Sequence, residues 1–362
     1  MKRSAQKGVT LVELMVALVI GAVTVLAIQQ VMAVFEGQKR SSTGGADAQV
    51  NGAVALFTLE REIRQAGYGL FTGEGALCPL GINIHHSGST SSDAGLLRPL
   101  LIHDGGSGPD AIEVVRADTG FGAIPVSIVR NMTNAAAAIT TESRIGLDKN
   151  ELFIAAGREG NKICTLMQVS QTPTESGGSF TVQHAASAPY NPLSPTTAFT
   201  TAPLYGVGDA AVVVGRFVHG RYQVLCNRLT EVDPSVTGGP FDCANTDPVV
   251  DQIIDLQAQY GVAPVGSMKV GQWCNATSSS SCGDWGNPDA SAITRVRAVR
   301  IAIVARSAQY EKEQVSPASL TLWDAGDPGD DPPTRALSGE ERHYRYKVFT
   351  TIVPIRNVIW GS

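Results

Sequence analysis

Hydrophobic and polar positions divide the chain into an apolar N-terminal stretch, an amphipathic segment and a long region of short alternating segments. No residue of 14–35 carries a formal charge, and the apolar stretch as a whole covers 9–35. A hydrocarbon core is crossed by roughly 20 helical residues, each rising about 1.5 Å. The pattern therefore predicts a membrane-spanning helix over 9–35.

Three basic residues, Lys2, Arg3 and Lys7, precede this stretch. Basic residues flank the cytoplasmic end of a span, so we expect everything beyond the helix to be exported. A secretory signal would place small residues at a cleavage site after its apolar region. Here the Gly8-Val9 junction comes before it. Cleavage there would remove a leader of residues 1–8 and keep the apolar helix.

Glu13 is the one carboxylate within the predicted span, near its start. A charge in a membrane helix costs about 2.5–3.5 kcal/mol on insertion scales, so such residues are functional candidates. A buried carboxylate is tolerated when a cation neutralises it. We therefore expect Glu13 to have a partner.

The segment Gly8-Val9-Thr10-Leu11-Val12-Glu13 resembles the class III signal of type IV pilins and pseudopilins. The resemblance implies that a prepilin peptidase cuts after Gly8 and that Val9 is then methylated. It also implies that Glu13 meets the N-terminal amine of a neighbouring subunit during assembly. Members of that family most often carry Phe or Met where this chain has Val9.

The helix is expected to continue over 36–69 as an amphipathic segment. A spacing of three, four and three residues aligns apolar side chains along one face, and this stripe is expected to pack on a sheet: Leu56, Leu59, Ile63 and Ala66. Glycines at 67 and 69 predict the end of the helix. Alternating charges near this end are interpreted as a solvated face with local ion pairs: Glu60, Arg61, Glu62 and Arg64.

Residues 70–362 are expected to form a β-rich head outside the cytoplasm. Short β-branched or aromatic segments alternate there with turn-rich stretches, as at 111–116, 151–156 and 211–218. Late in the chain the alternation predicts a strand with one buried face: Val299, Ile301 and Ile303 on one side, Arg300 and Arg306 on the other. The fold class is therefore α+β, with a long N-terminal helix packed on a large, mostly antiparallel head.

Four further segments are similar to PilW-type minor pilins in order and character: 57–69, 254–261, 296–307 and 346–357. Residues 70–250 are weakly covered by this resemblance. It implies a minor pilin of a type IV pilus that helps to prime assembly at or near the tip. The implied partners are other minor pilins, the major pilin, the prepilin peptidase, the inner-membrane assembly platform and a tip adhesin.

Composition restricts the possible partners of the exported part. Loss of Lys2, Arg3 and Lys7 changes the formal net charge from −5 to −8. A nucleic-acid-binding surface requires a basic patch, and the sequence shows none. We therefore expect no nucleic-acid partner.

Six cysteines all lie in the part placed outside the cytoplasm, which favours structural disulfides. Fifteen connectivities are possible. Two pairings close short loops in Gly-, Ser- or Asp-rich segments, Cys274 with Cys282 and Cys226 with Cys243. Cys78 with Cys164 remains by elimination. No C-x2-C pair supports a zinc site.

Catalytic and metal-binding interpretations have less support from the sequence than the pilin interpretation. His103, Asp104 and Ser107 lie close in sequence, yet no nucleophile elbow accompanies them, so a glycine-rich loop before a strand is favoured. An acidic loop offers oxygen ligands for calcium but lacks the EF-hand pattern: Asp324, Asp327, Asp330 and Asp331. We expect no enzyme and no cofactor.

Two alternatives to the minor-pilin interpretation stay open. A type II secretion pseudopilin would share the same signal and helix. An adhesin-like pilus subunit would carry a ligand-binding site in the weakly covered middle region.

Overall fold

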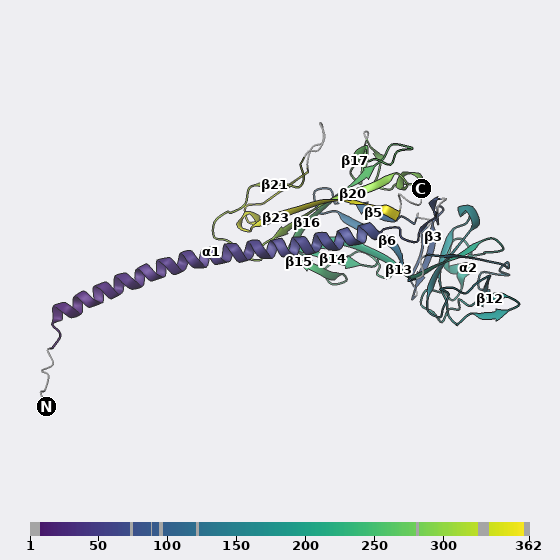
Figure 1. Cartoon of the computed structure of the whole chain (residues 1–362), viewed down its shortest axis with the longest axis horizontal. Helices are drawn as coiled ribbons and strands as arrows, with labels where there is room; N and C mark the ends of the chain where they lie inside the picture. The colour runs from purple at the N-terminus through teal and green to yellow at the C-terminus, as the bar shows by residue number, and fades with distance from the viewer. Residues whose placement is uncertain are drawn as a thin grey trace, which may run out of the picture.

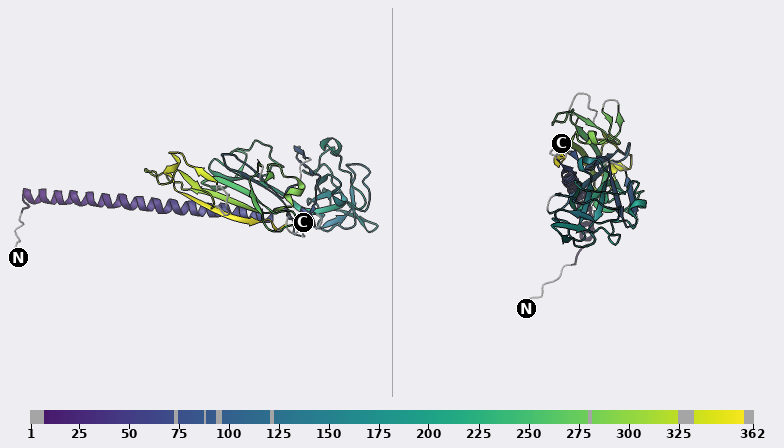
Figure 2. Two further views of the ribbon diagram at one scale, coloured as in Figure 1. Left: turned by 90° about the horizontal axis from the view of Figure 1, so that it is seen from above. Right: turned by 90° about the vertical axis from the view of Figure 1, so that its right-hand side faces the viewer.

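The computed structural model describes residues 8–72, 75–87, 89–93, 97–120, 123–279, 282–324 and 333–357. A single helix, α1 (Leu11–Gln65), projects from a β-rich head for about half its length (Figure 1). The head lies around the second half of α1, and β12 and α2 lie at its end farthest from the N-terminus (Figures 1 and 2). The expected α+β architecture is confirmed.

The second half of α1 is amphipathic in the way the sequence predicts. Leu59, Ile63 and Ala66 are fully buried and Leu56 is partly buried, so the expected stripe does pack on the head. The regular helix ends at Gln65, two residues before Gly67, because the Ala66 N–H donates its hydrogen bond to the Ile63 carbonyl oxygen, which is only three residues back.

A four-stranded antiparallel sheet supports this helix. Its order is β17 (Gln272–Cys274), β16 (Ile253–Val262), β20 (Val296–Arg306) and β23 (Tyr346–Pro354). Val299, Ile301 and Ile303 of β20 face the core that contains α1. The opposite face is not solvated, however, so the prediction of a single buried face was wrong.

The second face of β20 is covered by residues that follow it in the chain. Leu320, Leu322, Trp323 and Leu337, in and beside the hairpin of β21 (Ser319–Thr321) and β22 (Thr334–Ala336), pack on Ala302 and Val304. Arg300 is 6% exposed on this face. Its guanidinium lies 4.8 Å from the Trp273 ring and 4.6 Å from the Trp323 ring, which stabilises a buried cation.

The larger sheet has ten strands and is organised around β13 (Ala210–Leu225). At the bulge of Gly215, where φ is +64°, β13 exchanges its neighbours β9 and β7 for β6 and, further on, β14. Only the β10–β3 pair is parallel among the described pairings. The other strands of this sheet are β3 (Ile82–His86), β4 (Ser89–Asp93), β5 (Leu100–His103), β6 (Ala111–Asp118), β7 (Pro125–Ser127), β9 (Leu152–Ala156), β10 (Cys164–Gln168), β14 (Arg228–Val232) and β15 (Asp247–Asp251).

Smaller elements complete the head. One three-stranded sheet has the order β11-β12-β8, and two further hairpins pair β1 with β2 and β18 with β19. Their bounds, with those of the short helices, are β1 (Phe71–Thr72), β2 (Gly75–Ala76), β8 (Ile139–Thr141), β11 (Thr174–Ser176), β12 (Ser179–Val182), β18 (Ser278–Ser279), β19 (Gly283–Asp284), α2 (Pro195–Ala198), α3 (Ala290–Ile293), η1 (Arg158–Gly160) and η2 (Glu341–His343).

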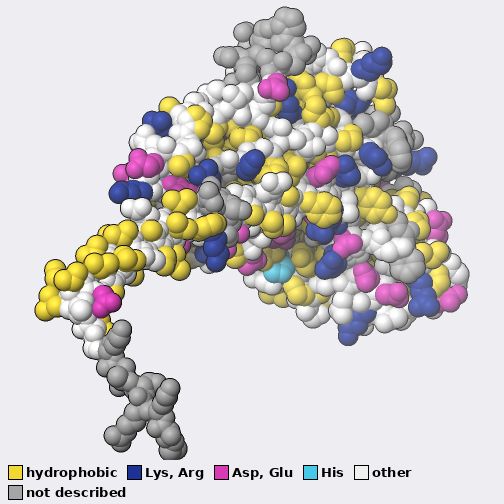
Figure 3. Space-filling view, turned by 60° about the vertical axis from the view of Figure 1, so that its left-hand side comes forward, with side chains coloured by type: hydrophobic (Ala, Val, Ile, Leu, Met, Phe, Trp, Pro, Cys, Tyr) yellow, Lys and Arg dark blue, Asp and Glu magenta, His cyan; other side chains and the backbone are white. Residues whose placement is uncertain are grey.

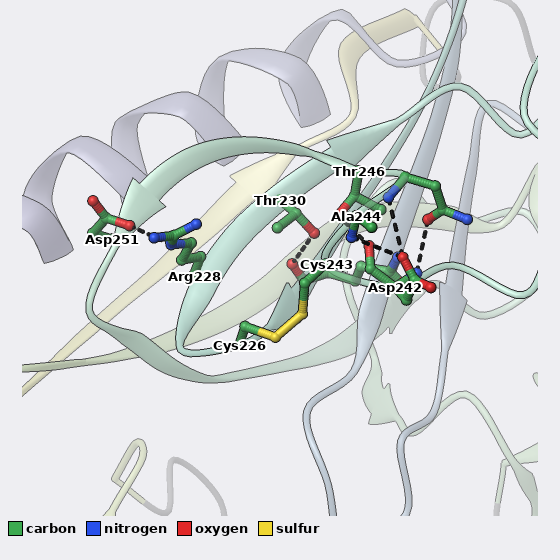
Figure 4. The surroundings of a disulfide bond; sticks show 10 residues. Cys226, Arg228, Thr230, Asp242, Cys243, Ala244, Thr246 and Asp251 are labelled. Atoms are coloured by element: carbon green, nitrogen blue, oxygen red, sulfur yellow. Dashed lines mark hydrogen bonds and ion pairs between the residues drawn. A yellow bond between two sulfur atoms is a disulfide. The ribbon is translucent and has the colours of Figure 1, made fainter.

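Three disulfides join Cys78–Cys164, Cys226–Cys243 and Cys274–Cys282. The last two are the pairs that short loops favour, and the first is the pair expected by elimination. Cys226 lies in the β13–β14 turn with φ of +50°, and Figure 4 shows its bond to Cys243 in the long loop that follows β14. Each such crosslink stabilises by about 2–4 kcal/mol in the chain-entropy model. The three disulfides therefore crosslink segments of the head that lie 86, 17 and 8 residues apart in the sequence.

The charged end of α1 is only partly solvated. Arg64 and Glu60 form an exposed ion pair, as expected. Glu62, in contrast, is 3% exposed and lies between Arg61, at 2.8 Å, and Arg116 of β6, at 3.3 Å. The interpretation of Glu62 as part of a solvated face was wrong, because β6 brings a cation from a distant part of the chain against it.

Gly52 of α1 offers a test of this packing. A Cβ added at Gly52 would overlap the Phe349 ring of β23, whereas a Cβ at Gly45 in the same helix would meet nothing within 4 Å. Alanine improves helix propensity by about 1 kcal/mol at either site. Overpacking costs about 1–3 kcal/mol. We expect Gly52→Ala to lower the thermal unfolding midpoint of the head and Gly45→Ala to leave it unchanged or raise it.

The measurement is thermal unfolding of the full chain in detergent, with the disulfides intact. Equal midpoints for the two variants would contradict close packing of α1 on β23.

Candidate functional site

The start of α1 has a complete set of capping interactions. Thr10 is the N-cap residue, and its hydroxyl oxygen accepts a hydrogen bond from the Glu13 N–H at 3.3 Å. The Glu13 carboxylate accepts hydrogen bonds from the Thr10 N–H and the Thr10 hydroxyl, both at 3.0 Å. This reciprocal arrangement is a capping box, and it satisfies donors that would otherwise lack a partner at a helix start.

Sequence reasoning identified Glu13 but missed Thr10. The signal was present, because Thr10-Leu11-Val12-Glu13 has the S/T-x-x-E spacing that precedes an apolar helix. In the isolated subunit Glu13 therefore has a local role in starting α1. Its role between subunits, which the resemblance implies, is additional and remains a prediction.

Gly8 and Val9 precede the helix and are exposed. Val9 is 73% exposed, and no atom lies within 4 Å of the Cβ position at Gly8. A peptidase could therefore reach the Gly8–Val9 bond without displacing any part of the head. The basic residues Lys2, Arg3 and Lys7 lie outside the described residues.

The first half of α1 is apolar and has no covering within the subunit. Among the described residues, Leu11–Gly37 is a helix long and apolar enough to cross a membrane, and none of it is buried against the head. Figure 3 shows hydrophobic side chains covering this free part of the helix. Such a surface requires lipid or other protein around it.

The histidine, aspartate and serine of the 103–107 segment do not converge on a reactive site. Asp104 accepts a hydrogen bond from the Gly106 N–H within the turn that leads into β6. His103 instead approaches Glu113 of β6, with 2.9 Å between Nε2 and Oε2. His219 of β13 contacts the other carboxylate oxygen of Glu113, with 2.5 Å between Nε2 and Oε1. The cluster connects three strands.

Two carboxyls, the buried Asp110 beside this cluster and the half-buried Glu113 within it, have opposite pKa shifts. Burial raises the pKa of Asp110 to about 6, although its carboxylate accepts hydrogen bonds from the Gly105 and Ala258 N–H groups. Burial would also raise the pKa of Glu113, but hydrogen bonds and charge from His103 and His219 hold it well below its usual range.

The acidic loop considered for calcium falls mostly outside the described residues. Asp327, Asp330 and Asp331 lie outside the described residues, and Asp324 alone of the four belongs to them. Within the part of the chain that the structure describes, no group of three or more His, Cys, Asp or Glu side chains could hold a metal ion.

Comparisons with known proteins agree with the N-terminal geometry. Residues 3–28 match the prokaryotic N-terminal methylation motif, which includes Gly8, Val9 and Glu13. The chain therefore carries a class III prepilin signal, and with its apolar helix and β-rich head it is a type IV pilin-like protein.

Residues 213–357 match the family described as Type IV Pilus-assembly protein W, so the chain contains a PilW-family domain. This range includes the late segments at 254–261, 296–307 and 346–357. The segment 57–69, which also resembles this family in sequence, lies outside both matched ranges. No curated protein matches the chain.

Among solved structures, the chain is similar to a type IV-like pilin from Thermus thermophilus. The two sequences are 11% identical, and the alignment covers 86% of this chain and 97% of that chain with a TM-score of 0.31. At this TM-score the similarity supports no further argument.

The two carboxyls predict opposite pH effects on stability. Because the pKa of Asp110 is raised in the folded state, this carboxyl adds stability at low pH that is lost as pH rises from about 4 towards 6. Asp110→Asn should remove that loss. Because the pKa of Glu113 is lowered in the folded state, this carboxyl adds stability above pH 4.5, its ordinary pKa, and the added stability is lost as pH falls below 4.5. The advantage of the wild type over Glu113→Gln should therefore shrink below pH 4.5.

Urea unfolding of both variants and the wild type, at steps between pH 3 and pH 7, measures these slopes. Slopes of the same sign for Asp110→Asn and Glu113→Gln, each relative to wild type, would contradict the assignment.

Proposed function

We propose that this protein is a non-catalytic minor pilin of a type IV pilus. It is held in the inner membrane by α1 with its head in the periplasm, cleaved after Gly8 by a prepilin peptidase, and methylated on Val9. It then joins other minor pilins on the inner-membrane assembly platform to prime the filament of major pilin.

The observation that carries this proposal is the uncovered apolar half of α1 with Glu13 at its start. Residues 11–37 have no contact with the head, so they are available first to lipid and later to other helices. Extraction from the membrane exchanges lipid contacts for helix–helix contacts, which rely on packing and polar pairing. Glu13 then pairs with the amine of a neighbouring subunit and sets the register between the two helices.

The size of the head favours a place at or near the pilus tip. Helices that pack closely in a filament require heads narrow enough to pack around them. Here the strands extend from both sides of α1 and continue beyond its C-terminal end (Figures 1 and 2). Repeated along a filament, such heads would collide, whereas a few copies at the tip, alongside an adhesin, would not.

A pilus is favoured over a secretion system by the match to a family described by pilus assembly. Purification of the tagged protein from membranes, followed by identification of its partners, distinguishes the two. Minor pilins would support the proposal, and components of a secretion apparatus would overturn it.

Substitutions at the start of α1 separate helix capping from pairing between subunits. Glutamine at position 13 can still accept the Thr10 hydrogen bonds but carries no charge. We expect Glu13→Val and Glu13→Gln to be cleaved and yet to abolish association with other pilins and piliation. Thr10→Ala, which removes the cap and keeps the charge, should cost about 1 kcal/mol of helix stability and retain assembly.

Cleavage is followed by the mass of the N-terminal peptide, and assembly by co-purification and by counting pili. Normal piliation with Glu13→Gln would show that the charge has no role in assembly.

A further inference from the structure

A pocket of about 510 Å³ lies in the head, where the end of α1 meets β6 and the bulge of β13 (Figure 1). Pockets that bind small molecules commonly measure about 300–1,000 Å³. Part of its wall belongs to the range that matches the PilW family, and part to the middle region before that range. We call it the β13 pocket, and its wall includes Gln168, Tyr190, Phe217, His219 and Glu231.

Two side chains of this wall carry buried polar atoms that lack a hydrogen-bond partner among the described residues, Gln168 Oε1 and His219 Nδ1. A buried polar atom costs stability until something bonds to it. The Gln168 oxygen is an acceptor, because the amide nitrogen of this side chain donates to the Asn150 carbonyl oxygen at 2.9 Å.

The second of these atoms is also an acceptor. His219 Nε2 lies 2.5 Å from Glu113 Oε1, so we assign the proton of the neutral ring to Nε2. Nδ1 then carries a lone pair. A molecule that satisfies both atoms must therefore supply hydrogen-bond donors.

Two carboxylates of the wall add further acceptor capacity. One oxygen of Glu231 accepts from the Tyr222 hydroxyl at 3.0 Å, and one oxygen of Asp233 accepts from the Ser235 N–H at 2.8 Å. A carboxylate has about four acceptor positions, so both side chains keep capacity for a ligand. The β13 pocket thus suits a molecule with several donors.

The charges of the wall disfavour a strongly charged ligand. Both Glu62 oxygens are already paired, with Arg61 at 2.8 Å and with Arg116 at 3.3 Å. Arg216 pairs with Asp118. An ion would have to compete with these pairs, whereas an uncharged ligand would not. The wall contains as many cationic as anionic side chains: Arg61, Arg116, Arg216, Glu62, Glu231 and Asp233.

Aromatic and apolar side chains complete the wall. Tyr190 is half-buried, and its ring is held by an edge contact with His86, with 4.9 Å between the ring centroids. Phe217 and Leu152 are buried beside it in the same wall. Aromatic faces combined with a few polar groups bind ligands that have an apolar face and a polar rim.

We propose that the β13 pocket binds a neutral saccharide. The C–H face of the sugar ring lies against Tyr190, and hydroxyl groups donate to Gln168 Oε1, His219 Nδ1 and Glu231. These hydroxyls reproduce the hydrogen bonds that water would make in the free pocket, so little is lost when water is displaced. The inference goes beyond the proposed function and does not depend on the position of the subunit in a filament.

The test is saturation-transfer NMR of the full chain in dodecylphosphocholine, a detergent without a sugar head group. The probes are glucose, galactose, mannose, N-acetylglucosamine, N-acetylgalactosamine, lactose and maltose. We expect at least one of them to bind with a Kd of about 1 mM or lower. Binding by none of them would overturn the proposal. Putrescine and inorganic phosphate are measured alongside, and binding by either of these in the absence of saccharide binding would overturn it as well.

Substitutions locate the bound saccharide. Tyr190→Ala removes the ring, and we expect the Kd to rise about tenfold or more, whereas Tyr190→Phe keeps the ring and should retain binding. Tyr310→Ala is the matched control, because Tyr310 also contacts a histidine ring, at 4.7 Å, but lies outside the pocket wall. An equal loss with Tyr310→Ala, or no loss with Tyr190→Ala, would contradict the assignment.

A labelling experiment on the wild type avoids any effect of substitution on folding. A diazirine derivative of the saccharide that binds should label peptides containing Tyr190 or Phe217. Labelling confined to other peptides would overturn the proposal. Such a result would leave the minor-pilin proposal standing, because neither Glu13 nor the apolar half of α1 belongs to the β13 pocket.

Discussion

The close packing of the second half of α1 on the sheets is the constraint on which the rest of the structure depends. Ala48, Gly52 and Ala55 present almost no side chain to the head, so Phe349 of β23 reaches the helix backbone. The main core contains residues of α1 together with residues of both large sheets, including Tyr222 and Tyr260. Without the helix this core would be open to water along one side. The head is thereby fixed to the second half of the helix.

The parts of the fold that could be predicted are those in which local pattern and tertiary burial agree. The stripe containing Leu59 and Ile63 packs as its spacing predicts, and the strands at 111–118 and 152–156 follow short β-branched segments. Prediction failed where a distant segment changes the surroundings. Arg300 looks solvated in sequence, but the β21–β22 hairpin buries it between two tryptophans. Glu62 looks like part of a charged helix face, but Arg116 meets it from β6.

The candidate site was more predictable than the head because it is local. Gly8, Val9 and Glu13 lie within six residues, and their meaning depends on one neighbouring apolar run. Thr10 could have been found from the same six residues. The exposure of Val50 and Phe57 could not have been found in this way, because these residues differ from Leu56 and Leu59 only in the side of the helix to which they belong. Which side faces solvent is decided by how the sheets surround α1.

The capping box explains how a carboxylate is tolerated at the start of an apolar helix before any partner subunit is bound. In the isolated subunit one carboxylate oxygen of Glu13, Oε2, accepts hydrogen bonds from both Thr10 donors at the start of the apolar helix. Pairing with an amine must compete with these hydrogen bonds, and it gains because opposite charges attract strongly where water is excluded. On the proposed function, the exchange would become favourable only when neighbouring helices have displaced lipid and water together. Glu13 would then discriminate between a lone subunit and a packed one.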